Sequence, residues 1–428
     1  MNSEEQTMQC KAPRGTYDVL PPDSQKWQYV EKVVRETACL FGYREIRTPI
    51  FEHTELFERG VGDTTDIVTK EMYTFQDKAN RSLTLRPEGT ASCVRALVEH
   101  SVYGGIMPVK WYYGGPMFRY DRPQTGRYRQ FNQFGVEVFG SNSPYLDAEI
   151  IMLLVEILGN LGLEDYELHL NSVGCPVCRE TYRRKLLDHI APVKAQLCSD
   201  CQLRYEKNPL RVIDCKVESC REAITGFPNI YDSLCTDCSQ HYAQVKAALL
   251  DSRINYIQDH NLVRGLDYYT NTAFEIHIPD IGAQSAVGGG GRYNGLVKEC
   301  GGPDMPGIGF ALGMERLLLA LDKPTEGQQS EGDLDVFLAV QDEKWAGKAL
   351  HILDQLRKSK IRADRDYNGR SMKAQMKYAD KLGARIVLLL GENEVTGGFI
   401  TLRNMATREQ LQVTSDDLVI CLQDILAR

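Results

Sequence analysis

Apolar residues recur with helical spacing early in the chain and with strand spacing directly afterwards. Apolar positions fall every three or four residues over 27–41, which predicts a helix that Asp23 or Ser24 caps and that Gly42 ends. Residues 43–51 then alternate between polar and apolar, which is typical of a strand. The chain is therefore predicted to begin with a helix followed by a strand.

Short strands and helices alternate irregularly over the rest of the first 325 residues. Strand-like runs stand at 82–86, 109–115 and 130–140, and helical patterns stand at 91–100 and 147–161. A parallel sheet would require a regular succession of strand, helix and strand, which this region lacks. We therefore expect an α+β fold built on an antiparallel sheet.

Two changes of composition divide the chain. Residues 173–250 are rich in cysteine and charge and carry helical patterns, so we predict a mostly helical insertion there. Residues 326–333 are polar and rich in glycine, which is typical of a linker. Strands and helices alternate after it, which predicts a small α/β domain with parallel strands. The expected domains are 1–325, interrupted by the insertion, and 334–428.

Composition and charge exclude several classes of protein. No apolar stretch is long enough to span a membrane, and the N-terminus lacks the basic start and apolar run of a secretory signal. We therefore expect a cytoplasmic protein without a membrane partner. The net charge of −8 counts against a protein that only binds nucleic acid. The basic stretch 357–381 would form either a local phosphate-contact surface or a solvated helix face.

Known phosphate-binding loops are absent from the sequence. The glycine-rich run 288–295 fits neither a P-loop nor a dinucleotide-binding fingerprint. Two interpretations of this run remain open. Its glycines would either let the backbone come close to a ligand or form a flexible hairpin.

Residues 109–140 read as a strand, an arginine-rich loop and a second strand. The period of two places five residues of the second strand on one face: Phe131, Gln133, Gly135, Glu137 and Phe139. This face would be either the floor of a small-molecule site, with space above the glycine, or an ordinary solvated sheet face. Arginines on the first strand and in the loop favour an anionic ligand.

Three other charged or aromatic positions have both a functional and an ordinary structural interpretation. Glu88 stands between a strand and a helix that starts at Thr90, where a carboxylate binds a ligand or caps the helix. Arg316 lies in the first turn of an apolar helix, where it indicates a bound anion or a side chain that reaches solvent. Tyr268 and Tyr269, in the segment LVRGLDYYT, would by themselves be a packed sheet edge.

Together these segments resemble the three signature motifs of class II aminoacyl-tRNA synthetases. The helix and strand that end near Pro49 resemble motif 1, FRYDRPQTGRYRQF (118–131) resembles motif 2, and GIGFALGMERL (307–317) resembles motif 3. Two further segments, LVRGLDYYT (262–270) and GGGGRYNGL (288–296), resemble the signatures of histidyl-tRNA synthetases. The likeness extends over nearly the whole chain, in the same order.

The resemblance implies a six- or seven-stranded antiparallel catalytic sheet, a homodimer and a C-terminal anticodon-binding domain. It also implies the activity, in which L-histidine reacts with ATP and Mg2+ to histidyl-adenylate and is then transferred to the 3′ end of tRNA(His). Two alternatives stay open. One is a catalytically inactive paralogue that regulates histidine biosynthesis, and the other is a class II enzyme for a different amino acid.

The resemblance also assigns residues to three ligands. Histidine would contact Glu88, Gly89, Thr90, Arg119, Gln133, Glu137, Arg264, Tyr268, Tyr269 and Tyr293. ATP would contact Arg119, Asp121, Arg127, Tyr128, Phe131 and Arg316. The tRNA acceptor end would contact Gln124 and Arg129. Arg119 and Arg264 would be the catalytic pair, on opposite sides of the reacting phosphate. Asp121 stands where the family more often has Glu, which leaves its contact to adenine or to metal in doubt.

Eight of the 13 cysteines lie in the insertion and form four closely spaced pairs. The pairs are Cys175 and Cys178, Cys198 and Cys201, Cys215 and Cys220, and Cys235 and Cys238. Such spacings in a cytosolic chain suit structural zinc with four thiolate ligands, in one or two sites. Reduced, partly buried thiols without metal are the alternative.

Overall fold

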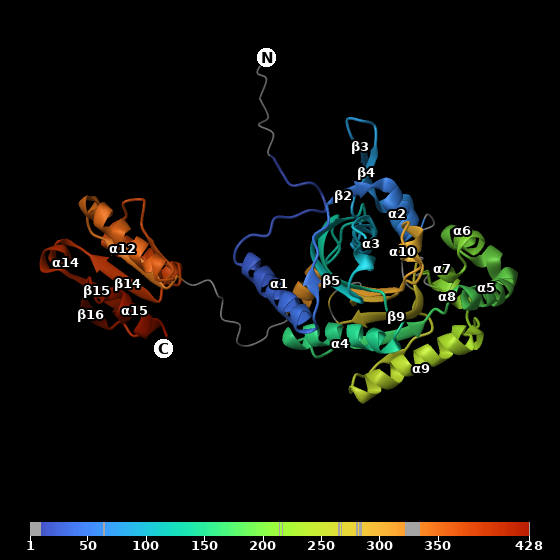
Figure 1. Ribbon diagram of the computed structural model, residues 1–428. Coiled ribbons are helices and arrows are strands. Elements are labelled where there is room, and N and C mark those ends of the chain that lie inside the picture. Colours follow the sequence, from blue (N-terminus) through green and yellow to red (C-terminus); the bar gives the residue numbers. More distant parts are fainter. Residues whose placement is uncertain are drawn as a thin grey trace, which may run out of the picture. The chain divides into compact units, whose positions relative to one another are not determined.

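The computed structural model describes residues 10–62, 65–213, 215, 217–263, 266, 268–279, 281, 285–321 and 334–427. The chain divides into two compact units, Met1–Glu326 and Gly327–Arg428, each of which has its own core (Figure 1). The linker predicted at 326–333 lies outside the described residues. Among the described residues, no helix combines the length and the apolar character that a membrane span needs.

The first unit is built on an eight-stranded sheet. Its strands, in spatial order, are β1 (Arg44–Glu45), β5 (Val109–Phe118), β6 (Gln130–Phe139), β11 (Gly307–Gly313), β10 (Ala286–Arg292), β9 (Thr270–His277), β7 (Glu167–Ser172) and β8 (Ile257–Gln258). The six inner strands are antiparallel, as predicted, whereas β1 and β8 pair in parallel at the two edges. The six antiparallel strands agree with the implied six- or seven-stranded antiparallel sheet. The two parallel edge strands were not predicted, because two-residue strands leave almost no pattern in a sequence.

Helices and a smaller sheet surround this sheet. The helices outside the insertion are α1 (Asp23–Leu40), α2 (Thr54–Val61), a π-helical turn (Ile67–Glu71), α3 (Thr90–Glu99), α4 (Pro144–Asn160), α10 (Leu296–Glu299) and α11 (Met314–Leu321). A three-stranded sheet has the order β2 (Phe51–His53), β4 (Ser82–Leu85) and β3 (Tyr73–Gln76). Helices α1, α4 and α11 share one core with the large sheet, to which Val34, Ile150 and Leu317 contribute.

The boundaries of the first helix differ slightly from the prediction. Helix α1 begins at Asp23 itself, and Pro22 is the N-cap, so neither Asp23 nor Ser24 caps it. Gly42, with a φ of 82°, follows the helix in the left-handed region, which accounts for its termination there.

The insertion consists mainly of helices, as predicted. Its elements are α5 (Pro176–Ile190), α6 (Ser199–Lys207), α7 (Leu210–Ile213), α8 (Glu218–Ala223), α9 (Thr236–Asp251) and 3-10 turns at Ala191–Gln196 and Ile230–Ser233. Tyr182, Leu186 and Ile190 of α5 are buried in its core. Helix α9 packs on α4, and this contact fixes one side of the insertion to the first unit (Figure 1).

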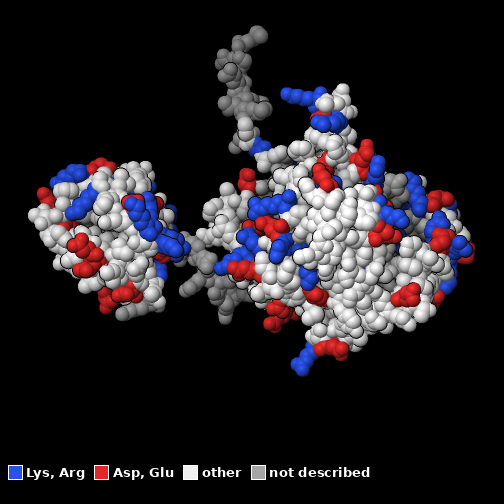
Figure 2. All heavy atoms as spheres, in the orientation of Figure 1, with Lys and Arg blue, Asp and Glu red and all other residues white. Residues whose placement is uncertain are grey.

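The second unit has a five-stranded sheet with helices. Its strands, in spatial order, are β13 (Ala363–Arg365), β12 (Val336–Val340), β14 (Ile386–Leu390), β15 (Phe399–Asn404) and β16 (Gln410–Thr414). Its helices are a 3-10 turn (Glu343–Trp345), α12 (Ala346–Lys358), α13 (Met372–Lys381), α14 (Glu392–Gly397) and α15 (Leu418–Leu426). The first three strands are parallel as predicted, but β15 and β16 are antiparallel. Both signs of charge appear on the visible face of this unit (Figure 2).

Candidate active site

A cavity of about 380 Å³ lies over the middle strands of the large sheet. Glycines of β10 and β11 lie beneath it at positions that leave no space for a side chain. A Cβ added at Gly290 would lie 1.9 Å from the carbonyl oxygen of Gly309, and one added at Gly309 would lie 2.1 Å from Glu137 Oε2. The glycine run is thus part of an inner strand and not a flexible hairpin. It also lines the cavity through Gly288, as the other interpretation required.

Glu137 of β6 does not itself line this cavity but lies directly behind Thr90 and Tyr293, which do, and it is almost completely buried. Thr90 Oγ1 donates a hydrogen bond of 2.7 Å to its Oε1, and Tyr293 donates one to its Oε2. Burial raises the pKa of Glu137 to about 8, against the hydrogen bonds from Tyr293 and Thr90 that lower it. The solvated face that alternation would ordinarily indicate is therefore wrong here, since other elements cover these residues.

Glu88 combines the two roles between which the sequence could not decide. Its carboxylate accepts hydrogen bonds from the backbone N–H groups of Thr90, at 2.7 Å, and Ala91, at 2.8 Å, so it caps helix α3. The same side chain lines the cavity. Burial raises the pKa of Glu88, while the two backbone donors lower it. The buried carboxyl group of Glu88 therefore lines the cavity, and that of Glu137 lies next to it.

Tyrosines form one wall of the cavity. The ring centroid of Tyr268 lies 4.7 Å from that of Tyr269 and 5.7 Å from that of Tyr293. Both Tyr268 and Tyr269 directly precede strand β9, so the connection between β8 and β9 carries them. Arg264, the fourth residue predicted from the same signatures, lies outside the described residues.

Sequence reasoning missed Tyr113 of strand β5, whose hydroxyl donates a long hydrogen bond of 3.4 Å to Glu137. Its ring fills the space that Gly135 was predicted to leave for a ligand. A Cβ at either Gly89 or Gly135 would lie only 2.3 Å from this ring. The register Tyr113↔Gly135 was the available signal, because a glycine opposite an aromatic residue makes room for its ring.

Gln133 and Arg119 present polar groups near the tyrosine wall. The Oε1 atom of Gln133 is buried and has no hydrogen-bond partner among the described residues, which is costly unless a ligand or water satisfies it. Arg119 donates from Nε to the carbonyl of Pro87 at 2.8 Å, and its guanidinium lies 5.2 Å from the ring centroid of Phe131. Burial lowers the pKa of Arg119, although Glu71 and Glu88 raise it.

The residues predicted for ATP line the other part of the same cavity. They are Arg119, Asp121, Arg127, Tyr128, Phe131 and Arg316. Arg127 forms an ion pair with Asp121, and Arg316 donates to the carbonyl of Gly126 at 3.2 Å. Burial lowers the pKa of Arg316, and repulsion by Arg127 lowers it further. Arginines held this close to one another favour a polyanionic ligand.

Gln124 and Arg129, the residues predicted for tRNA, lie in the loop between β5 and β6 and do not line the cavity. Gln124 is exposed, and its backbone pairs with that of Arg127. The guanidinium of Arg129 lies 4.0 Å from the ring centroid of Tyr120, so its position is fixed by stacking.

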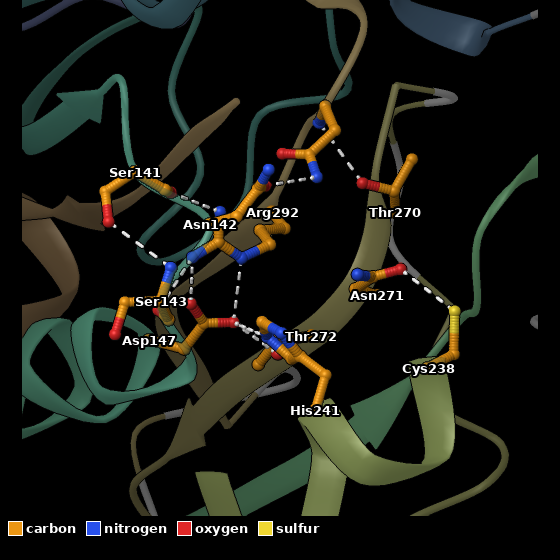
Figure 3. Close-up of polar contacts among 11 residues, drawn as sticks. Ser141, Asn142, Ser143, Asp147, Cys238, His241, Thr270, Asn271, Thr272 and Arg292 are labelled. Carbon is orange, nitrogen blue, oxygen red and sulfur yellow. Dashed lines mark hydrogen bonds and ion pairs between the residues drawn. The ribbon is translucent and has the colours of Figure 1, made fainter. Parts of the chain in front are cut away.

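Arg292, next to the cavity residue Tyr293, belongs to a separate buried network (Figure 3). It forms an ion pair with Asp147 of α4, in which its Nε lies 3.1 Å from Oδ2. His241 of α9 lies 2.8 Å from the same oxygen, and Thr272 of β9 donates to it at 2.5 Å. This network joins α4, the insertion and the sheet behind the tyrosine wall.

The chain is similar to known proteins over nearly its whole length. Residues 15–179 and 214–317 match the family model for histidyl-tRNA synthetase, and residues 335–425 match the model for the anticodon binding domain. The histidine–tRNA ligase of Syntrophomonas wolfei is 66% identical over 419 residues, which cover 98% of this chain and 99% of that protein. The histidine–tRNA ligase of Desulforamulus reducens is 54% identical over 96% of this chain and 98% of its own length.

A solved structure agrees with these relatives. The crystal structure of apo histidyl-tRNA synthetase from S. aureus has a TM-score of 0.83 and 44% identity, and the match covers 97% of this chain and 100% of that chain. The family models, the identity to these relatives and the similarity to the solved structure agree, and they show that the chain belongs to the histidyl-tRNA synthetase family.

Proposed function

We propose that this chain attaches L-histidine to the 3′ end of tRNA(His) through a histidyl-adenylate intermediate. The observation that carries the proposal is the cavity, in which buried carboxyl groups and tyrosines adjoin an arginine cluster. The first part suits a small zwitterion with a polar side chain, and the second suits a triphosphate. The family relationship and the presence of both units support the same conclusion.

The buried polar groups would select histidine. Glu88 and Gln133 would bind its α-ammonium group, together with Thr90. Glu137 and the tyrosines Tyr268, Tyr269 and Tyr293 would face the imidazole. An amino acid without a polar ring would leave these buried groups unpaired, which is a strong basis for rejection.

The adenylation step requires positioning and charge stabilisation rather than a protein nucleophile. A carboxylate oxygen of histidine forms a bond to the α-phosphorus of ATP, and the bond from that phosphorus to the β-phosphate oxygen breaks and releases pyrophosphate. Arg119 would stabilise the charge that develops on the α-phosphate, with Arg264 opposite it. The 3′-hydroxyl of tRNA then attacks the acyl carbonyl, its proton is lost, and AMP leaves.

ATP would enter as its magnesium complex. Arg127 and Arg316 would hold the outer phosphates, and adenine would stack on Phe131. Glu275 and Glu315 line the cavity and offer the carboxylate oxygens that Mg2+ prefers. No step of this reaction needs the cysteine-rich insertion, so any metal bound there would have a structural role.

Contacts outside the cavity would bind tRNA and a second subunit. Gln124 and Arg129 would contact the acceptor end, and the second unit would bind the anticodon. A homodimer is supported by the resemblance to motif 1 and by apolar side chains such as Leu40, which is 82% exposed. Since tRNA charging serves translation, we infer that the chain acts in the cytoplasm.

Exchange of pyrophosphate into ATP, assayed with each amino acid separately, tests the proposal. We expect exchange with histidine alone. Absence of exchange with every amino acid would instead support the regulatory paralogue, which the high identity to histidine–tRNA ligases does not favour. Exchange with another amino acid would refute the assigned substrate.

A matched pair of variants tests the role of Arg119. Arg119→Lys keeps the charge but loses the planar guanidinium, and we expect the exchange rate to fall by on the order of 100-fold. Arg184→Lys changes an exposed arginine of the insertion in the same way and should leave the rate unchanged. Equal rates for both variants would contradict the role of Arg119.

A further inference from the structure

The eight cysteines of the insertion converge in two separate groups of four. The first cluster comprises Cys175, Cys178, Cys235 and Cys238, and the second comprises Cys198, Cys201, Cys215 and Cys220. Within each cluster all four sulfur atoms lie within 4.8 Å of one another. Each cluster thus joins two of the pairs found in the sequence, and the two clusters share no residue.

The spacing of the sulfur atoms fits a single tetrahedral ion. Four thiolates at the usual zinc–sulfur distance of about 2.3 Å stand about 3.8 Å from one another. The Sγ atoms of Cys175 and Cys178 are 3.5 Å apart, too far for a disulfide bond. None of the described cysteines forms a disulfide. A four-iron cluster binds each thiolate to a different iron atom and would separate the sulfurs further.

The backbone around both clusters favours thiolates. Cys175, Cys198 and Cys235 are the N-cap residues of α5, α6 and α9, where the helix dipole stabilises negative charge. The backbone N–H of Cys235 donates to Cys178 Sγ at 3.0 Å. In the second cluster, the N–H of Cys198 donates to Cys220 Sγ at 3.1 Å. The two clusters therefore share the same arrangement of helix N-terminus and N–H donor.

We propose that the insertion binds two zinc ions, one in each cluster, and that the ion of the first cluster holds the tyrosine wall of the histidine pocket in position. The positioning part rests on the proposed function of that pocket, whereas the binding of zinc does not. Four thiolates that converge without a metal would repel one another once ionised, and zinc removes that repulsion.

Three contacts connect the first cluster to the tyrosine wall. Cys238 Sγ lies 3.6 Å from Oδ1 of Asn271, which follows the wall by two residues (Figure 3). With the amide turned over, its nitrogen would donate to the zinc-bound thiolate from the same place. The N–H of Asn271 donates to the carbonyl of Gly174 at 3.0 Å, directly before Cys175. Arg179, next to Cys178, donates to the carbonyl of Tyr269 at 3.0 Å.

The backbone conformation of Asn271 depends on its contacts to the first cluster. Its φ of 49° lies in the left-handed region, which asparagine adopts more readily than most other residues but which is held here by the hydrogen bond to Gly174. Gly174, which accepts this hydrogen bond, is packed tightly against the first cluster, since an added Cβ would lie 2.6 Å from Cys178 Cβ. Loss of the ion would release the ends of α5 and α9 and, with them, this turn.

The second cluster has a different environment. Its buried cysteines pack in an apolar core that includes Leu197, Ile213 and Ile224 and that extends to the tyrosine wall, whereas the segment around the first cluster reaches the wall through hydrogen bonds. We therefore assign its ion to the stability of the insertion. This difference provides the matched control for the first cluster.

Metal analysis of the purified full-length chain by mass spectrometry tests the zinc sites. We expect two zinc ions per chain. The double variants Cys235→Ser/Cys238→Ser and Cys215→Ser/Cys220→Ser should each retain one, and Cys39→Ser/Cys421→Ser, outside the insertion, should retain both. Wild-type protein without zinc, with iron in its place, or with disulfides in these positions would overturn the proposal.

Histidine-dependent exchange tests the positioning role. The first-cluster variant should raise the KM for histidine on the order of tenfold and leave the KM for ATP unchanged. The second-cluster variant should leave both constants unchanged. A rise of the same size in both variants would overturn the clamp. If the variants are insoluble, the wild type is titrated with a chelator instead. The positioning role then requires that the KM for histidine rise as zinc is lost. Because the measurement of zinc content does not depend on enzyme activity, failure of the zinc proposal can be distinguished from failure of the proposed synthetase function.

Discussion

Replacement of Glu137 by Gln should change how the stability of the first unit depends on pH. In the folded chain the pKa of Glu137 is raised from 4.5 to about 8, chiefly by burial. Between these two values the folded state keeps a proton that the unfolded state has already lost. The stability contributed by this group is therefore complete below about pH 4.5 and falls as the pH rises towards 8.

The size of this pH-dependent loss of stability follows from the folded and unfolded pKa values of Glu137. Each pH unit between them lowers the free energy of unfolding by about 1.4 kcal/mol, and the whole interval amounts to about 5 kcal/mol. Glu137→Gln keeps the size of the protonated side chain and removes its titration. Relative to this variant, the wild type should lose about 2 kcal/mol of stability between pH 6 and pH 8, and little more above pH 9.

Urea unfolding of both proteins at pH 6, 7, 8 and 9, followed by tryptophan fluorescence, measures this difference. Glu99→Gln is the control. The side chain of Glu99 is exposed and the Arg95 guanidinium lowers its pKa, so its titration lies below this range and its difference from wild type should stay constant. A difference between wild type and Glu137→Gln that is constant or that grows with pH would refute the reasoning.

Three further changes have definite expectations. Gly135→Ala places a Cβ against the ring of Tyr113 and should lower the free energy of unfolding by about 1–3 kcal/mol, part of which Tyr113→Leu should restore in the double variant. Lys377→Glu should raise the KM for tRNA in aminoacylation without altering histidine-dependent pyrophosphate exchange, which needs no tRNA. Binding of histidinol at pH 8 should release protons from wild type but not from Glu137→Gln, because a bound cation lowers the raised pKa of the carboxyl. Calorimetry in buffers of different ionisation enthalpy measures that release, and proton uptake would contradict it.

Composition alone overestimates how many basic residues of the second unit are available to bind phosphate. The basic stretch 357–381 was counted as a potential phosphate-binding surface, but several of its arginines have partners within the second unit. Arg362 forms an ion pair with Asp335, and Arg370 forms one with Asp366. Exposed lysines remain on α13, where Lys377 and its neighbours at intervals of four residues share one face. A sequence counts charges, but only the fold shows which charges are already paired.

The alternation along β6 predicted correctly which residues share a face and could not predict what covers it. Phe131 and Gln133 line the cavity, and Glu137 lies behind its wall. The groups that exclude water from Glu137 come from far away in the chain, with Thr90 47 residues before it and Tyr293 156 residues after it. Periodicity is a local property, whereas burial depends on these distant neighbours.

The antiparallel strands β15 and β16 were missed for a related reason. Only Val413 of β16 is buried, so this edge strand has too few apolar residues to show a strand pattern. Its pairing with β15 depends on backbone hydrogen bonds, to which every residue type contributes equally. Strands β12 and β14 were predictable because nearly every residue in them is buried.

The segment GGGGRYNGL, which resembles a signature of histidyl-tRNA synthetases, contributes residues to two faces of the sheet at once. Tyr293 turns towards the cavity and donates to Glu137, whereas Arg292, its neighbour, turns to the other side and pairs with Asp147. An arginine in a strand would ordinarily be expected to reach solvent, yet Arg292 is completely buried. A buried charge that loses its partner is strongly destabilising, so neither residue of the pair can change alone. Because His241 of the insertion contacts the same carboxylate, the strand that leads to Tyr293 in the cavity wall also connects to the insertion behind it.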